Sequence, residues 1–303
     1  MIVVTGSEGF IGKALCDHFS TLDYRLIRVD KENTEDAVES GWLLDQESDF
    51  WRSITHVVHL GAISDTRAAL EDVLEQNLIF SIKLFEICRK YDIPFIYASS
   101  ASVYGNSLEF SETKIRFNRL NYYSMSKSFF DFYVTGRMNE LSTPVIGLRF
   151  FNVYGPTEYK KGGMASPVTT LAREIILKKE ATIFDIPGEY SKGRQSRDYV
   201  YIDDVLHFIN HLLNKPPKSG IYNLGTGLST SMNELVKVLS DELGISPKVS
   251  FFSPTQSIID SYQLYTKANL NLNKNSQLPT SRVTLREGIQ RIHKENMFGL
   301  IDG

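Results

Sequence analysis

The first thirty residues constrain the fold of this chain more than any other stretch. Residues 1–5 are almost wholly apolar, as in a strand that a parallel sheet buries on both faces, and three glycines follow, Gly6, Gly9 and Gly12. Apolar residues at helical spacing over 11–19 then predict a helix. Glycines at such a turn let the backbone approach a pyrophosphate, whose charge the helix N-terminus faces. The chain is therefore expected to begin with a dinucleotide-binding unit.

A second apolar strand is predicted at 24–29, and it ends at Asp30. An acidic residue at this position accepts hydrogen bonds from the adenosine ribose of a bound dinucleotide. Asp30 would repel a 2′-phosphate, whereas the ammonium of the neighbouring Lys31 can pair with one. The sequence therefore leaves both NAD and NADP open as cofactors.

Tyr123 and Lys127 form a candidate proton-transfer pair, because a helix brings residues four apart onto one face. A nearby ammonium favours phenolate and is expected to lower the tyrosine pKa from about 10 toward neutrality, where the phenol can act as a general base. A strand predicted at 95–98 runs into a serine-rich loop. Ser100 in that loop can bind a substrate hydroxyl and share its proton with a phenolate.

Another strand is predicted at 54–60, followed by a loop of small residues at 61–66. Loops at the carboxyl ends of strands are where open α/β sheets bind ligands. Residues 70–91 carry one apolar stripe and predict a single helix. Asn77 interrupts that stripe, so it either hydrogen-bonds a nearby loop or contacts the cofactor. The alternation of strands and helices predicts a doubly wound parallel sheet of the α/β class.

Composition excludes several functions. The 303 residues carry a net charge of −3, so no overall field recruits nucleic acid or an anionic membrane surface. No leader segment or membrane-spanning run is predicted, and Cys16 and Cys88 read as two buried thiols in a reducing compartment, which together predict a cytoplasmic protein. His56 and His59 lack the further ligands of a metal site, so packing or a simple hydrogen bond is the favoured interpretation and no metal is predicted.

The glycine turn, Asp30, Ser100 and the pair Tyr123 and Lys127, in this order, resemble the extended short-chain dehydrogenase/reductase superfamily. Later segments look like further landmarks of that superfamily, so the resemblance covers essentially the whole chain: 149–156, 197–205 and 222–227. It implies a Rossmann-type sheet with a smaller mixed C-terminal substrate domain. It also implies Ser100, Tyr123 and Lys127 as the catalytic trio, with Lys127 holding the nicotinamide ribose.

Within that superfamily, residues 154–166 are similar to a segment typical of ADP-L-glycero-D-manno-heptose 6-epimerases, which contribute a second acid/base lysine there. Matched against Gly-x-Met-Ala-Ser, that lysine is Lys161. The segment 262–266 also looks like that family. Two departures concern the substrate more than the chemistry: a longer loop at 186–196, and Pro167 in place of a small apolar residue.

The resemblance implies a further set of site residues. Those expected at the cofactor, which would be NADP or NAD, are Gly6, Gly9, Phe10, Ile11, Gly12, Asp30, Lys31, Leu60, Gly61, Ala62, Ile63, Ser64, Asn77, Lys127 and Val153. Those expected at a nucleotide-diphosphate sugar are Ser100, Asn152, Gly163, Phe184, Arg197 and Tyr262. Among the loop cations Arg197 is preferred for the diphosphate, because a guanidinium binds phosphate with two hydrogen bonds, whereas Lys192 and Arg194 are expected to be solvated.

The implied chemistry requires hydride transfer. A carbinol carbon without an acidifying neighbour inverts only if a nicotinamide removes its hydride and returns it to the opposite face. Tyr123 and Lys161 are the expected proton carriers on the two sides. Because epimerisation consumes no net cofactor, the nucleotide is expected to stay bound through many cycles.

Two other enzymes of the superfamily and one protein without catalysis are the alternatives to this interpretation. A 4,6-dehydratase is disfavoured because Ala101 and Ser102 stand where it would show an Asp-Glu pair, but only the segment around Lys161 argues against a UDP-hexose 4-epimerase. A non-catalytic cofactor-binding protein would commonly lose part of the trio, which is intact here.

Two expectations about organisation complete this interpretation. The dinucleotide domain is predicted at 1–151 with 195–227, and the substrate domain at 152–194 with 228–303. The resemblance further implies a homo-oligomer, with a pentamer as its form.

Overall fold

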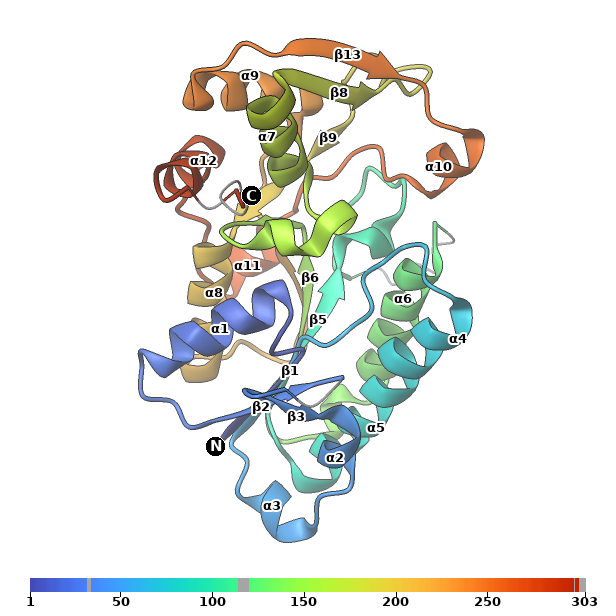
Figure 1. Ribbon diagram of the computed structural model, residues 1–303. Coiled ribbons are helices and arrows are strands. Elements are labelled where there is room, and N and C mark those ends of the chain that lie inside the picture. Colours follow the sequence, from blue (N-terminus) through green and yellow to red (C-terminus); the bar gives the residue numbers. More distant parts are fainter. Residues whose placement is uncertain (32–33, 114–119, 297, 300–303) are drawn as a thin grey trace.

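The structure, a computed structural model, describes residues 1–31, 34–113, 120–296 and 298–299 (Figure 1). Within them the central feature is a sheet of seven parallel strands in the order β11-β6-β5-β4-β1-β2-β3. Its strands are β1 (Ile2–Thr5), β2 (Leu26–Asp30), β3 (Val38–Glu39), β4 (His56–His59), β5 (Phe95–Ser100), β6 (Val145–Phe150) and β11 (Gly220–Leu224). The chain leaves β1 toward β2 on one side and returns to β4 on the other. The carboxyl ends of β1 and β4 therefore form the switch point at which such sheets bind ligands.

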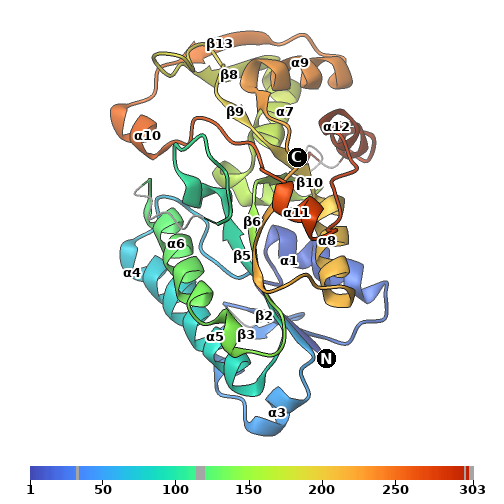
Figure 2. The same cartoon turned by 180° about the vertical axis from the view of Figure 1, so that it is seen from behind.

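Helices cover both faces of the sheet (Figures 1 and 2). On one face lie α1 (Phe10–Ser20) and α8 (Ile202–Asn214), and on the other α4 (Leu70–Val73), α5 (Phe80–Tyr91) and α6 (Tyr122–Thr135). Side chains of β1 alternate between the faces, so Ile2 and Val4 pack in the cluster that contains Leu15, while Val3 packs in the cluster that contains Leu84. Burial on both sides explains why this strand is apolar throughout.

A smaller region lies beyond the carboxyl edge of the sheet (Figure 1). Its paired strands are β8 (Glu180–Phe184) with β13 (Lys248–Phe252), β7 (Asn152–Tyr154) with β10 (Tyr199–Tyr201), and β9 (Ser196–Arg197) with β12 (Thr230–Ser231). The first two pairs are parallel and the third is antiparallel, so this region is mixed. Its main helices are α7 (Pro167–Lys178), α9 (Met232–Leu243) and α12 (Leu285–Lys294). The predicted fold class, a Rossmann-type sheet with a smaller mixed region, is confirmed.

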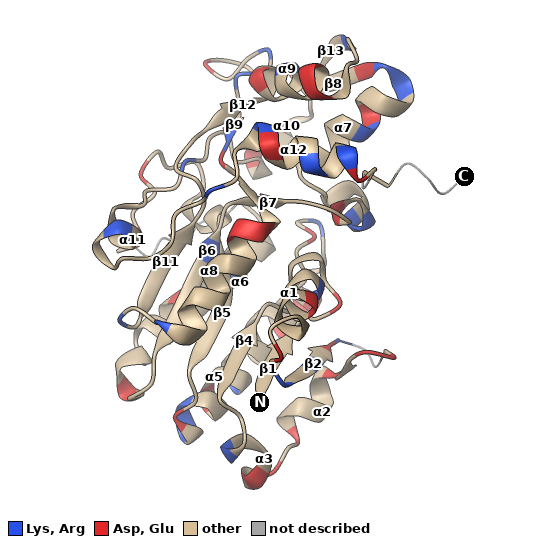
Figure 3. Ribbon diagram, turned by 90° about the vertical axis from the view of Figure 1, so that its left-hand side faces the viewer, with Lys and Arg blue, Asp and Glu red and all other residues tan. Residues whose placement is uncertain are grey.

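The remaining helices are short. They are α2 (Ser40–Leu44), α3 (Ser48–Arg52), α10 (Gln256–Ser261) and α11 (Asn271–Asn275). Figure 3 shows that charged residues lie mostly on helices and loops, whereas the strands of the large sheet are nearly free of them. Among the described residues, no helix combines the length and the apolar character needed to cross a bilayer.

The helix predicted at 70–91 and the position of Pro167 are two local points where the structure adds to the sequence analysis. The predicted single helix at 70–91 is wrong in detail, because a π-helical turn at Leu74–Ile79 separates α4 from α5. The wider turn carries Asn77, and such turns are frequent at functional sites. Pro167, which departs from the family pattern, is the first residue of α7, where a helix makes no use of a backbone N–H.

Candidate active site

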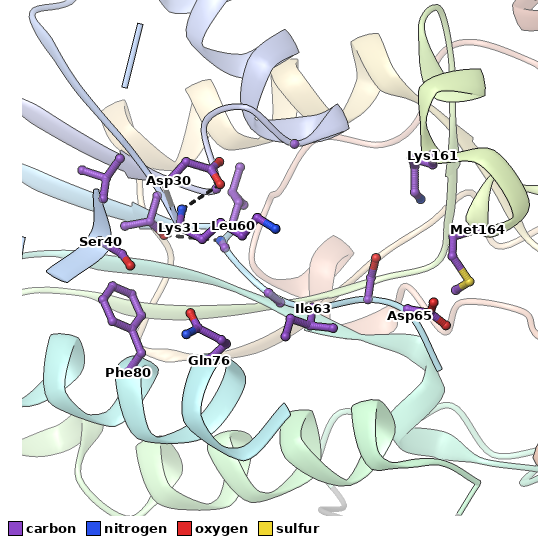
Figure 4. Close-up of a pocket in the computed structure, with 17 residues that line it drawn as sticks. Asp30, Lys31, Ser40, Leu60, Ile63, Asp65, Gln76, Phe80, Lys161 and Met164 are labelled. Carbon is purple, nitrogen blue, oxygen red and sulfur yellow. Dashed lines mark hydrogen bonds between the residues drawn. The ribbon is translucent and has the colours of Figure 1, made fainter. Parts of the chain in front are cut away.

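Two adjoining cavities lie along the carboxyl edge of the sheet. The first, of about 420 Å³, contains Asp30 and the loop at 60–64 (Figure 4). The second, of about 360 Å³, contains Ser100, Tyr123 and Lys127. They share lining residues from the glycine turn, from the loop after β4 and from the loop after β7: Gly6, Gly9, Leu60, Ala62, Ser64, Lys161 and Met164. The predicted cofactor residues line one or both cavities, apart from Asn77.

The glycine turn at the start of α1 has the shape that a pyrophosphate requires. Gly6 has a φ of 69°, and a Cβ placed there would lie 2.6 Å from the backbone of Gly61. A Cβ on Gly12 would overlap the carbonyl oxygen of Gly6. The first turn of α1 contains no acidic residue, so no carboxylate of that turn competes for its positive end. These residues fit a dinucleotide diphosphate.

Asp30 is held in place at the end of β2. Its Oδ2 accepts the backbone N–H of Glu8 at 2.9 Å, and its Oδ1 accepts that of Lys31 at 2.8 Å. Figure 4 shows Asp30 and Lys31 at one end of the first cavity, with Lys161 and Met164 at the other. A carboxylate fixed in this way can still accept ribose hydroxyls with its remaining lone pairs.

Asn77 takes the structural role that the sequence left open. It is fully buried, and its amide oxygen accepts the N–H of Ile63 at 2.7 Å while its amide nitrogen donates to the carbonyl of Ile63 at 2.9 Å. The same nitrogen lies 3.2 Å from Oγ of Ser126 on α6. The π-helical turn thereby fixes the loop at 60–64, which forms one wall of the first cavity.

The helix α6 places the tyrosine and the lysine on one side, as predicted. It begins with a capping box, in which the side chain of Asn121 accepts the backbone N–H of Ser124 and the hydroxyl of Ser124 accepts that of Asn121. Lys127 is 3% exposed, and its ammonium donates to the carbonyl of Ala98 at 2.7 Å. The ammonium lies 5.9 Å from the ring centre of Tyr123. The capping box and the burial of Lys127 therefore hold the two side chains on this side of α6.

The predicted direction of the tyrosine pKa is wrong for the protein as it stands. Burial raises the pKa of Tyr123, and only a hydrogen bond with Ser100 acts in the opposite direction. Burial also lowers the pKa of Lys127 to about 8, against the opposing effect of the Asp131 carboxylate. The sequence placed the two groups correctly, but it could not show how far the fold desolvates them, and desolvation is the largest cause of both pKa shifts.

Lys161 lines the same cavity but belongs to another element than Tyr123 and Lys127. It belongs to the 3₁₀ segment Glu158–Met164, and its side chain is 33% exposed. Its ammonium lies 5.8 Å from the ring centre of Phe10, at the start of α1. Lys161 and Tyr123 therefore line one cavity from two separate elements.

A third cavity, of about 520 Å³, adjoins the second at Ser100 and Asn152. It contains the six predicted substrate residues, namely Ser100, Asn152, Gly163, Phe184, Arg197 and Tyr262. The guanidinium of Arg197 lies 4.6 Å from the ring centre of Tyr262, and the rings of Phe184 and Tyr262 meet edge to face at 5.7 Å. Stacked aromatic and guanidinium groups suit a nucleotide base and its phosphates.

Asp198 holds this part of the substrate cavity together. Its buried carboxylate accepts backbone N–H groups from Thr226, Gly227 and Ala268 at 2.8–2.9 Å. The neighbouring Arg197 is thereby fixed where β9 and β10 meet.

Some residues of the third cavity were not among the predicted site residues, and Arg67 and Gln263 are two of them. Arg67 follows the loop after β4, so its position at the carboxyl edge was the available signal, and Gln263 belongs to the segment 262–266 that resembles the family. Lys192 and Arg194 are exposed, as expected for solvated loop cations.

Comparison with known families agrees with this geometry. Residues 2–225 match the model of the NAD dependent epimerase/dehydratase family. The chain belongs to this family. Two relatives are named ADP-L-glycero-D-manno-heptose-6-epimerase. The protein from Alkalilimnicola ehrlichii is 35% identical over 288 residues, with 89% of each chain covered. The one from Nitratidesulfovibrio vulgaris strain DP4 is 31% identical over 312 residues, with 95% of each covered.

Solved structures give the same result for the fold. The crystal structure of the Helicobacter pylori ADP-L-glycero-D-manno-heptose-6-epimerase matches with a TM-score of 0.81 at 29% identity, covering 99% of this chain and 96% of that one. A UDP-glucose 4-epimerase from Thermotoga maritima matches with a TM-score of 0.80 at 24% identity, covering 97% and 99%, and shows the fold alone. The predicted superfamily, the isomerase class and a nicotinamide dinucleotide as cofactor are confirmed for this epimerase family member.

Proposed function

We propose that this enzyme inverts C6 of an ADP-linked glycero-manno-heptose by transient oxidation and re-reduction. The observation that carries the proposal is that Tyr123 and Lys161 line one cavity from two separate elements. Two proton carriers on separate elements can each serve one of the two epimers at the inverted carbon. The heptose is favoured by relatives of this name that match nearly the whole chain.

Each site residue has its own role in this proposal. A bound nicotinamide supplies hydride removal and return. Tyr123 takes the substrate hydroxyl proton on one side and returns it, with Ser100 as its hydrogen-bond partner. Lys161 does the same for the other epimer. Lys127, a buried residue that lines the second cavity, holds the nicotinamide ribose, and Arg197 in the third cavity binds the diphosphate.

The preferred dinucleotide is NADP in this proposal. Lys31 lines the first cavity beside Asp30, and its ammonium is suited to a 2′-phosphate. The fixed carboxylate of Asp30 argues for a ribose hydroxyl, so NAD is the alternative cofactor.

The remaining features of the proposal concern organisation. Cys16 and Cys88 are buried and unpaired, and burial raises the pKa of Cys16 to about 11, which suits a reducing cytoplasm. We propose residues 1–151 with 195–227 as the dinucleotide domain and 152–194 with 228–303 as the substrate domain. A homo-oligomer, with a pentamer as the implied form, is proposed from the family resemblance, and sedimentation measures it.

The test of the activity uses the purified protein without added cofactor. It is incubated with ADP-D-glycero-heptose, and the configuration at C6 is followed by NMR. We expect conversion to a mixture of both epimers, because the resident dinucleotide is regenerated in each cycle. No conversion, together with conversion of a UDP-hexose, would replace the proposal by a 4-epimerase. No conversion of either sugar would support a non-catalytic cofactor-binding protein.

A further inference from the structure

Glu158 is a buried carboxylate at the start of the loop that carries Lys161. It is 1% exposed, and its Oε1 accepts the backbone N–H of Ser166 at 2.7 Å. Its Oε2 accepts the hydroxyls of Ser166 and Thr169, which lie at the start of α7. Three hydrogen bonds thus tie the first residue of the loop to the helix that follows it.

The same carboxylate faces the ammonium of Lys161. The Nζ of Lys161 lies 4.0 Å from Oε1 of Glu158 and 5.8 Å from the ring centre of Phe10. Burial raises the pKa of Glu158, while the Lys161 ammonium and the hydrogen bonds act in the opposite direction. A lysine side chain has four rotatable bonds, so an unrestrained ammonium would spread over many positions in an open cavity.

The backbone around this pair is held in unusual conformations. Thr157, immediately before Glu158, has a φ of 65°, and Gly162, immediately after Lys161, has a φ of 56°. A β-branched residue adopts this region only where the surroundings enforce it, and such residues gather at functional sites. The hydrogen bonds of Glu158 to Ser166 and Thr169 therefore help to hold the loop backbone in this conformation.

We propose that Glu158 is a positioning residue that holds the Lys161 ammonium at the mouth of the Tyr123 cavity. The inference rests on the proposed function in taking Lys161 as the second proton carrier. Glu158 itself is buried and acts through Lys161. Its three hydrogen bonds fix the carboxylate, and the fixed carboxylate restrains the ammonium of Lys161 through their ion pair.

The first experiment compares the wild-type holoenzyme with E158Q, K161M and the double variant. Glutamine keeps the shape of the side chain but removes the charge. Because Glu158 acts through Lys161, we expect E158Q to lower kcat by at least ~10-fold, to keep KM within ~2-fold, and to add nothing to K161M. Unchanged kcat in E158Q, or an equal further loss in the K161M background, overturns the proposal.

The variant T169V is the matched control. It removes one hydrogen bond to Glu158 but leaves the carboxylate charge, so a positioning role predicts kcat within ~3-fold of wild type. A purely structural role of Glu158 predicts similar losses in T169V and E158Q. If E158Q does not fold, E158D takes its place, because it retains the charge but withdraws it from the ammonium, and an intermediate loss of kcat is expected.

A second measurement needs no substrate. The holoenzymes are treated with a limiting amount of an amine-directed acylating reagent, and labelling of Lys161 is quantified by mass spectrometry against the exposed Lys160. We expect E158Q and E158D to raise the ratio of Lys161 to Lys160 labelling several-fold, because the ammonium is released. An unchanged ratio overturns the positioning role. Failure of the wild type to epimerise ADP-heptose would overturn the proposed function alone, since the labelling ratio does not depend on it.

Discussion

At the scale of single residues, burial decides the protonation of the proton-transfer pair. Burial raises the pKa of Tyr123 and lowers that of Lys127 to about 8, so the lysine loses its proton before the tyrosine does as pH rises. The phenol of the resting protein is therefore protonated near neutral pH. It begins the cycle as a hydrogen-bond donor, and its base form depends on the groups that a bound ligand adds.

The first residue-scale prediction concerns the phenol. Tyr123→Phe removes the hydroxyl and leaves the ring, so we expect kcat to fall by about 100-fold or more while the bound dinucleotide is retained. Turnover is measured by NMR and bound nucleotide by absorbance after denaturation. Tyr122→Phe is the matched control, because Tyr122 is an exposed neighbour on the same helix, and it should keep full activity. Activity of Tyr123→Phe close to that of Tyr122→Phe would remove Tyr123 from the mechanism.

At the scale of elements, His59 joins two strands and a helix below the cofactor loop. Its Nδ1 lies 2.6 Å from the hydroxyl of Thr5 on β1, and its Nε2 lies 2.7 Å from that of Ser81 on α5. The Ser81 hydroxyl already donates to the carbonyl of Asn77, so Nε2 carries the proton and Nδ1 accepts from Thr5. The hydrogen-bonding role that the sequence favoured for His59 is confirmed.

The element-scale prediction follows from that neutral imidazole. Burial lowers the pKa of His59 from 6.5 to about 3, so the unfolded chain binds the proton first as pH falls. The neutral His59 adds to the free energy of unfolding, and this addition is complete above pH 6.5. It is lost as the pH falls toward 3, at about 1.4 kcal/mol per pH unit. Urea unfolding at pH 7, 6 and 5 measures it. We expect the slope with pH to be shallower in His59→Gln by this amount, and equal slopes would contradict a neutral buried imidazole.

At the scale of the whole molecule, the candidate active site is lined by residues of the large sheet and of the smaller region. The sheet supplies the glycine turn, Ser100 and, through α6, the tyrosine and lysine. The chain beyond β6 supplies Lys161 and Arg197. Neither part alone encloses the second and third cavities, so closing the site depends on how the two parts pack.

The whole-molecule prediction concerns the cofactor as a folding ligand. Removal of the bound dinucleotide should lower the melting temperature of the protein, because only the folded chain binds the dinucleotide. Adding the dinucleotide back should restore the melting temperature. We expect NADP to bind at least about tenfold more tightly than NAD, and Lys31→Ala to reduce this ratio to about threefold or less. Calorimetry on the stripped protein measures both constants.

Lys83 offers a matched control for Lys31. Lys83 is exposed on α5 and lines none of the three cavities described above, so Lys83→Ala should leave the ratio unchanged. Equal affinity of the wild type for NAD and NADP would contradict the predicted preference for NADP.

The strands, the glycine turn and the spacing of the candidate catalytic groups follow from local patterns in the sequence. These features are local, because a glycine turn or a tyrosine four residues before a lysine acts through its own stretch of backbone. Fold class and family followed from the order of such stretches, and the residues expected at the substrate gather in one cavity. The π-helical turn at Asn77 broke the local pattern, since its cause is a hydrogen bond to a loop fourteen residues away.

Only the tertiary structure decided which charges are buried and what faces them. The raised pKa of Tyr123 arises from side chains and backbone that pack around it from other elements, and no spacing in the sequence encodes that burial. Glu158 reads as an ordinary loop carboxylate until α7 folds against it and Lys161 faces it. The physical reason is that desolvation depends on all the atoms around a group, and folding brings those atoms together from distant parts of the chain.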